Sequence, residues 1–231
     1  MSILESQSFP HDDRFLALRW VNGSGLSGQY NLFHELVLNL KVSPGYGIKT
    51  IDKPGKCLIV GDPESHQLKL IDLSNRVNSR LLSAAKSSES RDVKLYLQQH
   101  ATVLGPAGGI RGRLKFTANQ DAPWALVTAS YLPQDSLEPD LFVAQADARG
   151  EFVVDLSGLR LPDDNSIPEF TISVAAISGL MPDVAPNPDL FEDFRISTDM
   201  NAGNLQPDIT VTLENYGHVK QLGDLLIAPI L

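Results

Sequence analysis

The chain has 231 residues, of which 42% are hydrophobic and 20% charged, and its formal net charge is −9. This is the composition of a globular protein with one large or two small domains. Residues 1–105 carry 12 Lys and Arg against 10 Asp and Glu, whereas residues 106–231 carry 7 against 18. Because phosphate backbones attract basic surfaces, the acidic second half argues against nucleic acid as a partner.

The sequence shows no sign of a membrane span or of a secretory signal. It has no run of about 18 or more apolar residues, and the opening residues MSILESQSFPHDDRF lack the basic and apolar regions of a signal peptide. The one cysteine, Cys57, lies in an apolar run and is expected to be a buried thiol. We therefore expect a protein made in the cytoplasm, and its later release as part of an extracellular particle is compatible with this sequence.

The first half is expected to form a β domain. The 15 prolines and 17 glycines divide the chain into short segments, which favours a mainly β fold. Strands are predicted at residues 14–21, 31–42 (where a helical turn is the alternative), 56–60, 67–73 and 93–97. The strands at 56–60 and 67–73 are predicted to form a hairpin, and residues 81–86 a short helical turn.

A Gly- and Pro-rich segment at 104–109 coincides with the change in charge, so we place a domain boundary there. The two predicted domains, 1–105 and 106–231, are both small and β-sandwich-like. In the second domain, small or apolar residues alternate with basic ones over 108–116, which is the pattern of a half-buried strand. A second strand is predicted at 122–132, and a turn at 147–150 leads into a third at 151–156.

The remaining sequence is expected to complete this second domain. Strands are predicted at 169–177, at 191–196 as an edge strand, and at 208–214, with irregular loops at 158–168 and 178–188. The tail at 223–231 is apolar, so we expect it to pack either on its own domain or on a partner.

Three motifs lie in the segment 109–156: IRGRL at 110–114, ALVTA at 125–129 and ADARGEF at 146–152. Together they resemble the V-x-G-x-V, A-x-V-x-A and T-D-x-x-G-x-F pattern of the carboxypeptidase regulatory-like, or transthyretin-like, family. The resemblance implies a transthyretin/Ig-like β-sandwich. It implies no catalysis, because the hydrolases related to this family end in Tyr-Arg-Gly-Ser whereas this chain ends in Ala-Pro-Ile-Leu.

The layout of the whole chain carries a second resemblance. An N-terminal β segment, a hairpin, a linker and a regulatory-like sandwich resemble accessory proteins of phage-tail-like contractile injection particles. This implies a structural or adaptor subunit, associated with a spike or baseplate, whose partners are other protein subunits of the assembly.

The sequence offers no residue that we assign to catalysis, cofactor binding or metal binding, so we expect neither an enzyme nor a cofactor. The five histidines lack metal-ligand spacing, and a Gly-x-Ser-x-Gly nucleophile motif is absent. Acidic pairs are expected to be solvated loops or weak calcium sites: Asp163-Asp164, Glu192-Asp193 and Glu138-Pro139-Asp140. Residues 199–204 are interpreted as a turn, and Trp20 and Trp124 as core residues.

Two other functions compete with the structural one. The loops at 132–140 or 179–189 could hold a carbohydrate or a cell-surface ligand, which a glycan or calcium effect on the melting temperature would reveal. A hydrolase with an active site assembled from scattered residues is the second alternative.

Overall fold

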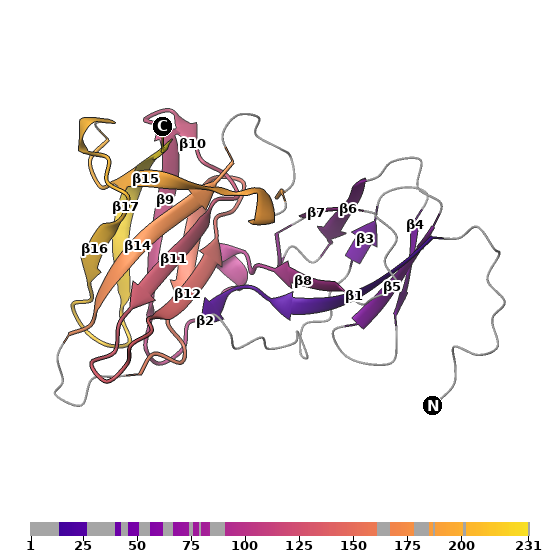
Figure 1. The fold of residues 1–231 in the computed structure, drawn as a ribbon, viewed down its shortest axis with the longest axis horizontal. Coiled ribbons are helices and arrows are strands. Elements are labelled where there is room, and N and C mark those ends of the chain that lie inside the picture. The colour runs from indigo at the N-terminus through magenta and orange to yellow at the C-terminus, as the bar shows by residue number, and fades with distance from the viewer. Residues whose placement is uncertain are drawn as a thin grey trace.

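The computed structural model is mainly β, as the sequence predicts (Figure 1). It describes residues 14–26, 40–42, 46–50, 56–61, 67–73, 76–78, 80–83, 91–160, 167–177, 185–186, 188–200 and 202–230. In these ranges the only helical segments are three short 3₁₀ turns, η1 (Gln99–Ala101), η2 (Pro188–Leu190) and η3 (Ala202–Asn204). None of the helical segments in these ranges has the length and apolarity needed to cross a membrane.

The first half of the chain forms two small sheets. A four-stranded sheet has the order β4 (Tyr46–Thr50), β5 (Lys56–Gly61), β1 (Arg14–Asn22) and β8 (Arg91–Leu95). A three-stranded sheet has the order β3 (Leu40–Val42), β6 (Gln67–Asp72) and β7 (Arg80–Ser83). Within the first sheet, β1 pairs with β5 in the antiparallel and with β8 in the parallel direction.

The predicted hairpin between 56–60 and 67–73 is wrong, although both strands exist. β5 pairs with β1 and β4, whereas β6 pairs with β3 and β7, so the two strands belong to different sheets. A polar loop with Gly and Pro suits a crossing between sheets as well as a hairpin turn, and turn chemistry does not choose a strand's partner. The helical turn predicted at 81–86 is also wrong over 81–83, because these residues pair with β6 as part of β7.

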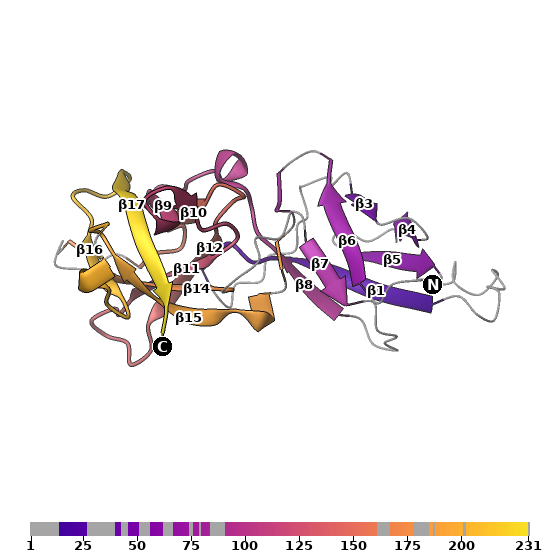
Figure 2. The ribbon, with the colours of Figure 1, turned by 90° about the horizontal axis from the view of Figure 1, so that it is seen from above.

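The second half, together with the short strand β2 of the first half, forms a ten-stranded sheet that bends into two layers (Figures 1 and 2). Its order is β10-β9-β17-β15-β14-β11-β12-β2, with β13 beside β9 and β16 beside β14. The strands are β2 (Gly25–Leu26), β9 (Gly109–Thr117), β10 (Gln120–Asp121), β11 (Leu126–Tyr131), β12 (Asp140–Gln145), β13 (Glu151–Asp155), β14 (Glu169–Ala176), β15 (Glu192–Ser197), β16 (Ile209–Thr212) and β17 (Val219–Pro229). In Figure 2, β9 and β17 lie in one layer, and β11 and β14 lie in the other.

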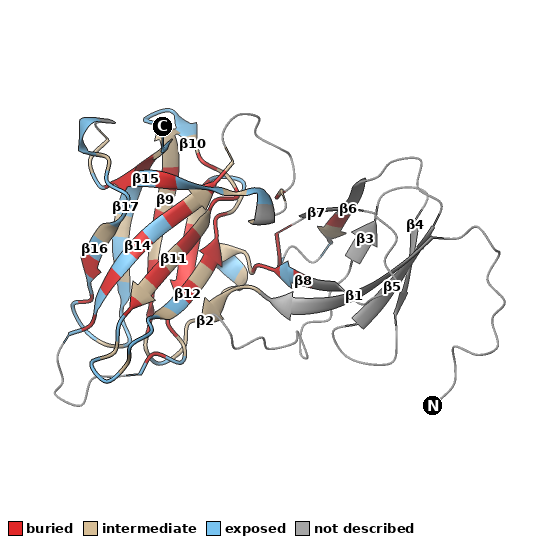
Figure 3. Ribbon diagram, viewed as in Figure 1, coloured by how far each residue is buried: buried red, intermediate tan, exposed pale blue. Residues whose placement is uncertain are grey.

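The core lies between the layers, and its buried residues are the red parts of the ribbon in Figure 3. Four phenylalanines are fully buried: Phe142, Phe152, Phe170 and Phe194. The Phe170 ring packs against Tyr131 and Phe142, with centroid distances of 5.6 and 6.3 Å. Trp124 is also buried, which confirms its prediction, whereas the side chain of Trp20 lies outside the described residues.

The structure corrects one expectation about the C-terminal segments and decides between two alternatives for another. The strand at 192–197 is not an edge strand, because β15 pairs with both β14 and β17. The apolar tail packs on its own domain: β17 lies between β9 and β15, and Leu225, Leu226 and Ile227 are buried there. A sequence pattern shows that a strand is apolar, but the number of its neighbours depends on the whole sheet.

Contacts cross the predicted boundary at 104–109. Residues of β2 pair with Phe142 and Val143 of β12. The Asn78 side-chain amide donates hydrogen bonds to Gln145 Oε1 and to the Ala146 carbonyl oxygen, at 3.1 and 3.2 Å. The first half of the chain thus adds a short strand and a buried hydrogen-bonded residue to the second half, and the division into domains 1–105 and 106–231 stays a prediction.

Candidate functional site

One outer face of the second half is strongly charged, and its charges are paired. On and beside β9, Arg113 contacts Asp121 at 2.7 Å and Lys115 contacts Asp224 of β17 at 2.8 Å. Hydrogen bonding to Asp121 raises the pKa of Arg113. Such pairs on a solvated sheet contribute to solubility and little to stability.

The outer face of the other layer has a different chemistry. Burial alternates along β11 and β14, so every second side chain points outward. The strand register places Ser130 opposite both Leu141 and Thr171, and Thr171 opposite Thr210. We call this surface the hydroxyl face; its outward side chains on β11, β12, β14 and β16 are Leu126, Thr128, Ser130, Leu141, Val143, Glu169, Thr171, Ser173, Ala175, Thr210 and Thr212. Glu169 is the one charged residue among these eleven; the charged residues Asp193, which lies opposite Ala175, and Arg195 border the face on the adjoining strand β15.

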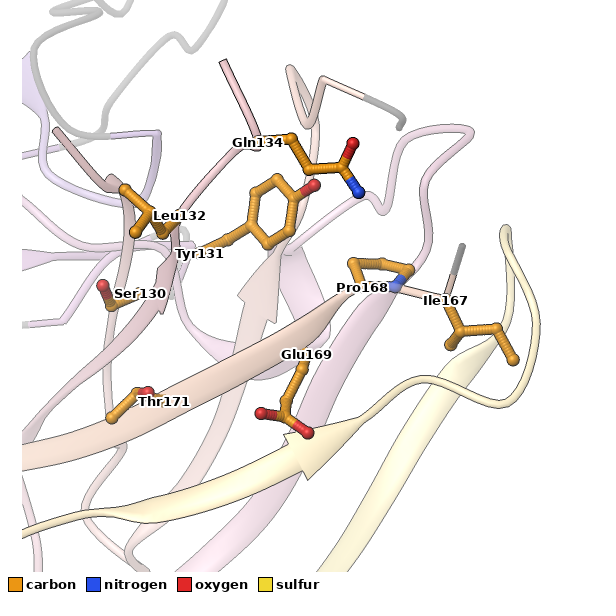
Figure 4. A pocket seen from close by; sticks show the side chains of 8 residues that line it. All are labelled: Ser130, Tyr131, Leu132, Gln134, Ile167, Pro168, Glu169 and Thr171. Atoms are coloured by element: carbon orange, nitrogen blue, oxygen red, sulfur yellow. The ribbon is translucent and has the colours of Figure 1, made fainter. Parts of the chain in front are cut away.

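A pocket of about 360 Å³ lies at one end of the hydroxyl face (Figure 4). It is lined by Ser130, Tyr131, Leu132, Gln134, Ile167, Pro168, Glu169 and Thr171. Tyr131 is 6% exposed and packs on Phe170, which ties the pocket to the core. At the rim, Leu132 and Ile167 are 59% and 53% exposed, so the pocket is open to solvent.

Glu169 forms no ion pair with any residue that the structure describes, whereas two cations on neighbouring segments do have partners. Arg160 donates two hydrogen bonds to Asp140, at 2.8 and 3.2 Å, and this bonding raises the pKa of Arg160. Lys220 donates to Glu214 at 2.7 Å, and this hydrogen bond lowers the pKa of Glu214. Both cations are therefore already compensated, and Glu169 is left as an acceptor facing solvent.

The loop between β11 and β12 has an ordered backbone of its own. Ser136 donates from its backbone nitrogen to the Pro133 carbonyl oxygen at 3.1 Å. Its hydroxyl also donates to the Glu138 carbonyl oxygen at 2.7 Å and accepts from the Glu138 backbone nitrogen at 3.2 Å. These local bonds hold the side of the pocket that Leu132 and Gln134 supply.

The residues considered as ligands or acids in the sequence do not gather at this pocket. His100 and His218 are exposed, while His11, His34, His66 and the pair Asp163-Asp164 lie outside the described residues. Glu192 and Asp193 belong to β15, so their expected position in a loop is wrong. Across the described ranges, no three His, Cys, Asp or Glu side chains come close enough together to hold a metal ion.

The predicted turn at 199–204 is present in the described part of that segment. Residues 202–204 form the 3₁₀ turn η3, and the Asn204 amide donates a hydrogen bond to Asp199 Oδ2 at 2.9 Å. This side-chain bond links the two ends of the segment.

Sequence reasoning found part of the pocket and missed the rest. The loop 132–140, named as a ligand loop, supplies Leu132 and Gln134, whereas most of the loop 179–189 lies outside the described residues. Ser130, Glu169 and Thr171 were missed. The sequence signal that could have identified them is the repeated Ser and Thr at outward positions of two strands. It predicts a common surface only when the two strands are known to be neighbours.

In comparisons with known proteins, the chain matches no family model, no curated protein and no solved structure.

Proposed function

We propose that the protein is a non-catalytic structural or adaptor subunit of a larger assembly and that it docks through the hydroxyl face. The observation that carries this proposal is the near absence of charge on that face. Residues 106–231 have a net charge of −11, from 7 Lys and Arg against 18 Asp and Glu, yet the face holds one carboxylate. The cores of protein interfaces are depleted in charged residues in the same way.

The hydroxyl face alone is too small for a stable protein interface. Four strands spaced about 4.8 Å apart, each about six residues long, cover roughly 400 Å². A stable interface needs about 800 Å² from each partner. The flanking loop between β11 and β12 is the natural extension, because Leu137 on it is fully exposed.

The assembly we propose is a phage-tail-like contractile injection particle, with this protein at the spike or baseplate. The support is the layout resemblance, together with the resemblance of residues 109–156 to the carboxypeptidase regulatory-like family. A mainly β protein with an uncharged sheet face suits docking on other subunits of such a particle.

The test is co-fractionation of the tagged protein from a native lysate, in matched variants. We expect the wild-type protein to migrate with a very large particle that contains sheath and tube subunits. A double variant with Thr171→Lys and Thr210→Lys places two charges on exposed positions of the hydroxyl face and should migrate as a monomer. Each exposed substitution changes stability by about 0.5 kcal/mol or less, and the two lysines, which lie opposite each other, add a repulsion of similar size, so the melting temperature should fall only slightly.

The matched control is Thr117→Lys, an exposed threonine at the end of β9, in the charged layer. This variant should migrate like the wild type. If the wild-type protein migrates as a free monomer, the proposal that it belongs to a larger assembly is wrong. If the double variant and the Thr117→Lys control migrate alike, the proposal that it docks through the hydroxyl face is wrong.

A ligand-binding module is the second candidate, and the pocket is the observation that favours it. In the described residues its lining has one carboxylate, hydroxyl groups and an amide, but neither His nor Cys. Such a lining offers hydrogen-bond acceptors and donors for a carbohydrate or surface ligand, without a base and nucleophile pair.

A further inference from the structure

The pocket at the end of the hydroxyl face has a lining that excludes several classes of ligand. Its described lining contains no Lys or Arg, so nothing there would neutralise a phosphate or carboxylate ligand. Its lining supplies one carboxylate, Glu169, whereas a divalent metal ion needs several charged or carbonyl oxygens as ligands. The pocket also lacks an open aromatic platform for a sugar ring, because its one aromatic side chain, Tyr131, is 6% exposed.

The same lining is complementary to an organic cation with an aliphatic stem. Glu169 is exposed and has no ion pair in the described part of the chain, and the cations of Arg160 and Lys220 are held by other carboxylates. The hydroxyl group of Thr171 lies two residues beyond Glu169 on the same strand, and that of Ser130 lies opposite Thr171 on the adjacent strand β11. Both can accept further hydrogen bonds. Leu132 and Ile167 form exposed apolar walls that would contact a methylene chain.

We propose that this pocket binds the guanidinium group of an arginine side chain from a protein partner. This proposal rests on the proposed docking function and names the chemistry of its contact. Arginine fits better than lysine because its five N–H donors can reach Glu169 and the two hydroxyl groups at once. Arginine is also enriched in protein interfaces, and the acidic half of the chain would attract a basic partner surface.

The test is a titration of the isotopically labelled full chain, followed by the backbone amide signals in NMR. The probe is N-acetyl-arginine amide, and the neutral isostere N-acetyl-citrulline amide is the control compound. We expect saturable shifts at Ser130, Leu132, Glu169 and Thr171 with the arginine probe, and binding of citrulline that is weaker by roughly threefold to fivefold, because citrulline lacks the charge that pairs with Glu169. Glu169→Gln should raise the dissociation constant roughly threefold to fivefold, the usual loss for one solvent-exposed ion pair.

A matched variant is Glu192→Gln, which removes an exposed carboxylate on β15, outside the hydroxyl face. It should bind the arginine probe like the wild type. Equal responses to arginine and citrulline, or equal binding by the two glutamine variants, would overturn the proposal. A response to methyl glycosides without a response to arginine would also overturn it and assign the pocket to a saccharide.

The outcome is separable from that of the docking proposal. If the arginine probe fails but the Thr171→Lys and Thr210→Lys variant still leaves the particle, the arginine contact is wrong and the docking face stands. If the arginine probe binds as expected but the wild-type protein migrates alone in the lysate, the pocket stands and the assembly is wrong.

Discussion

At the scale of single residues, the core of the second half of the chain contains a large aromatic side chain packed against a glycine. Phe152 of β13 is fully buried and lies opposite Gly112 of β9. A Cβ atom on Gly112 would come within 3.0 Å of the Phe152 ring. The glycine therefore makes room for the aromatic ring, and the pair fixes the register between the two strands.

Phe152→Ala should lower the free energy of unfolding by about 3–5 kcal/mol, because it leaves a cavity that Gly112 cannot fill. Urea denaturation would measure the change, and Phe152→Leu, which keeps most of the volume, should cost less. A loss of less than about 1 kcal/mol for the alanine variant would mean that the ring does not fill the core.

At the scale of elements, the last strand has a greater structural role than its position at the end of the chain suggests. β17 pairs with β9 in the parallel direction and with β15 in the antiparallel direction, so it joins two parts of the sheet. Ile227 lies opposite Ile196, and both are buried. Removal of residues 227–231 would take away Ile227 and expose Ile196 and the backbone groups of β15.

Deletion of residues 227–231 should therefore lower the melting temperature of the isolated protein strongly, since loss of one buried Ile alone costs about 2–5 kcal/mol. Deletion of residues 230–231 is the control and should have little effect, because Ile230 is 49% exposed. Thermal unfolding followed by circular dichroism would compare the two. Unchanged melting after the longer deletion, with loss of assembly, would instead indicate a tail that docks on a partner.

At the scale of the whole molecule, the two halves have separate sheets but share a junction. The buried cluster of the second half runs from Ile110 to Ile227, and among the described residues of the first half the partly buried hydrophobic side chain of Leu26 on β2 packs against it. Asn78 adds two hydrogen bonds across the junction. The second half thus holds nearly all of its own core, while the first half covers one edge strand.

A fragment of residues 106–231 should therefore fold cooperatively on its own, with a lower melting temperature than the full chain because β12 loses its pairing with β2. Differential scanning calorimetry of the fragment and the full chain would measure this difference. A fragment without a cooperative transition would show that the boundary at 104–109 is misplaced.

The positions of most strands could be predicted from residue order alone. Alternation in segments such as 108–116 and 169–177 is a local signal, because neighbouring side chains in a strand point to opposite faces. The mainly β class followed from the short segments into which the prolines and glycines divide the chain. The strand at 140–145 was not predicted, because its first residue, Asp140, was assigned to the loop at 132–140.

Which strands lie side by side was decided only in three dimensions. The polar loop after β5 is compatible with a hairpin, yet β5 and β6 belong to different sheets. Ser130 and Thr171 likewise meet only because β11 pairs with β14. Pairing depends on which apolar faces can be buried together across the whole chain, so the hydroxyl face and its pocket are products of tertiary structure.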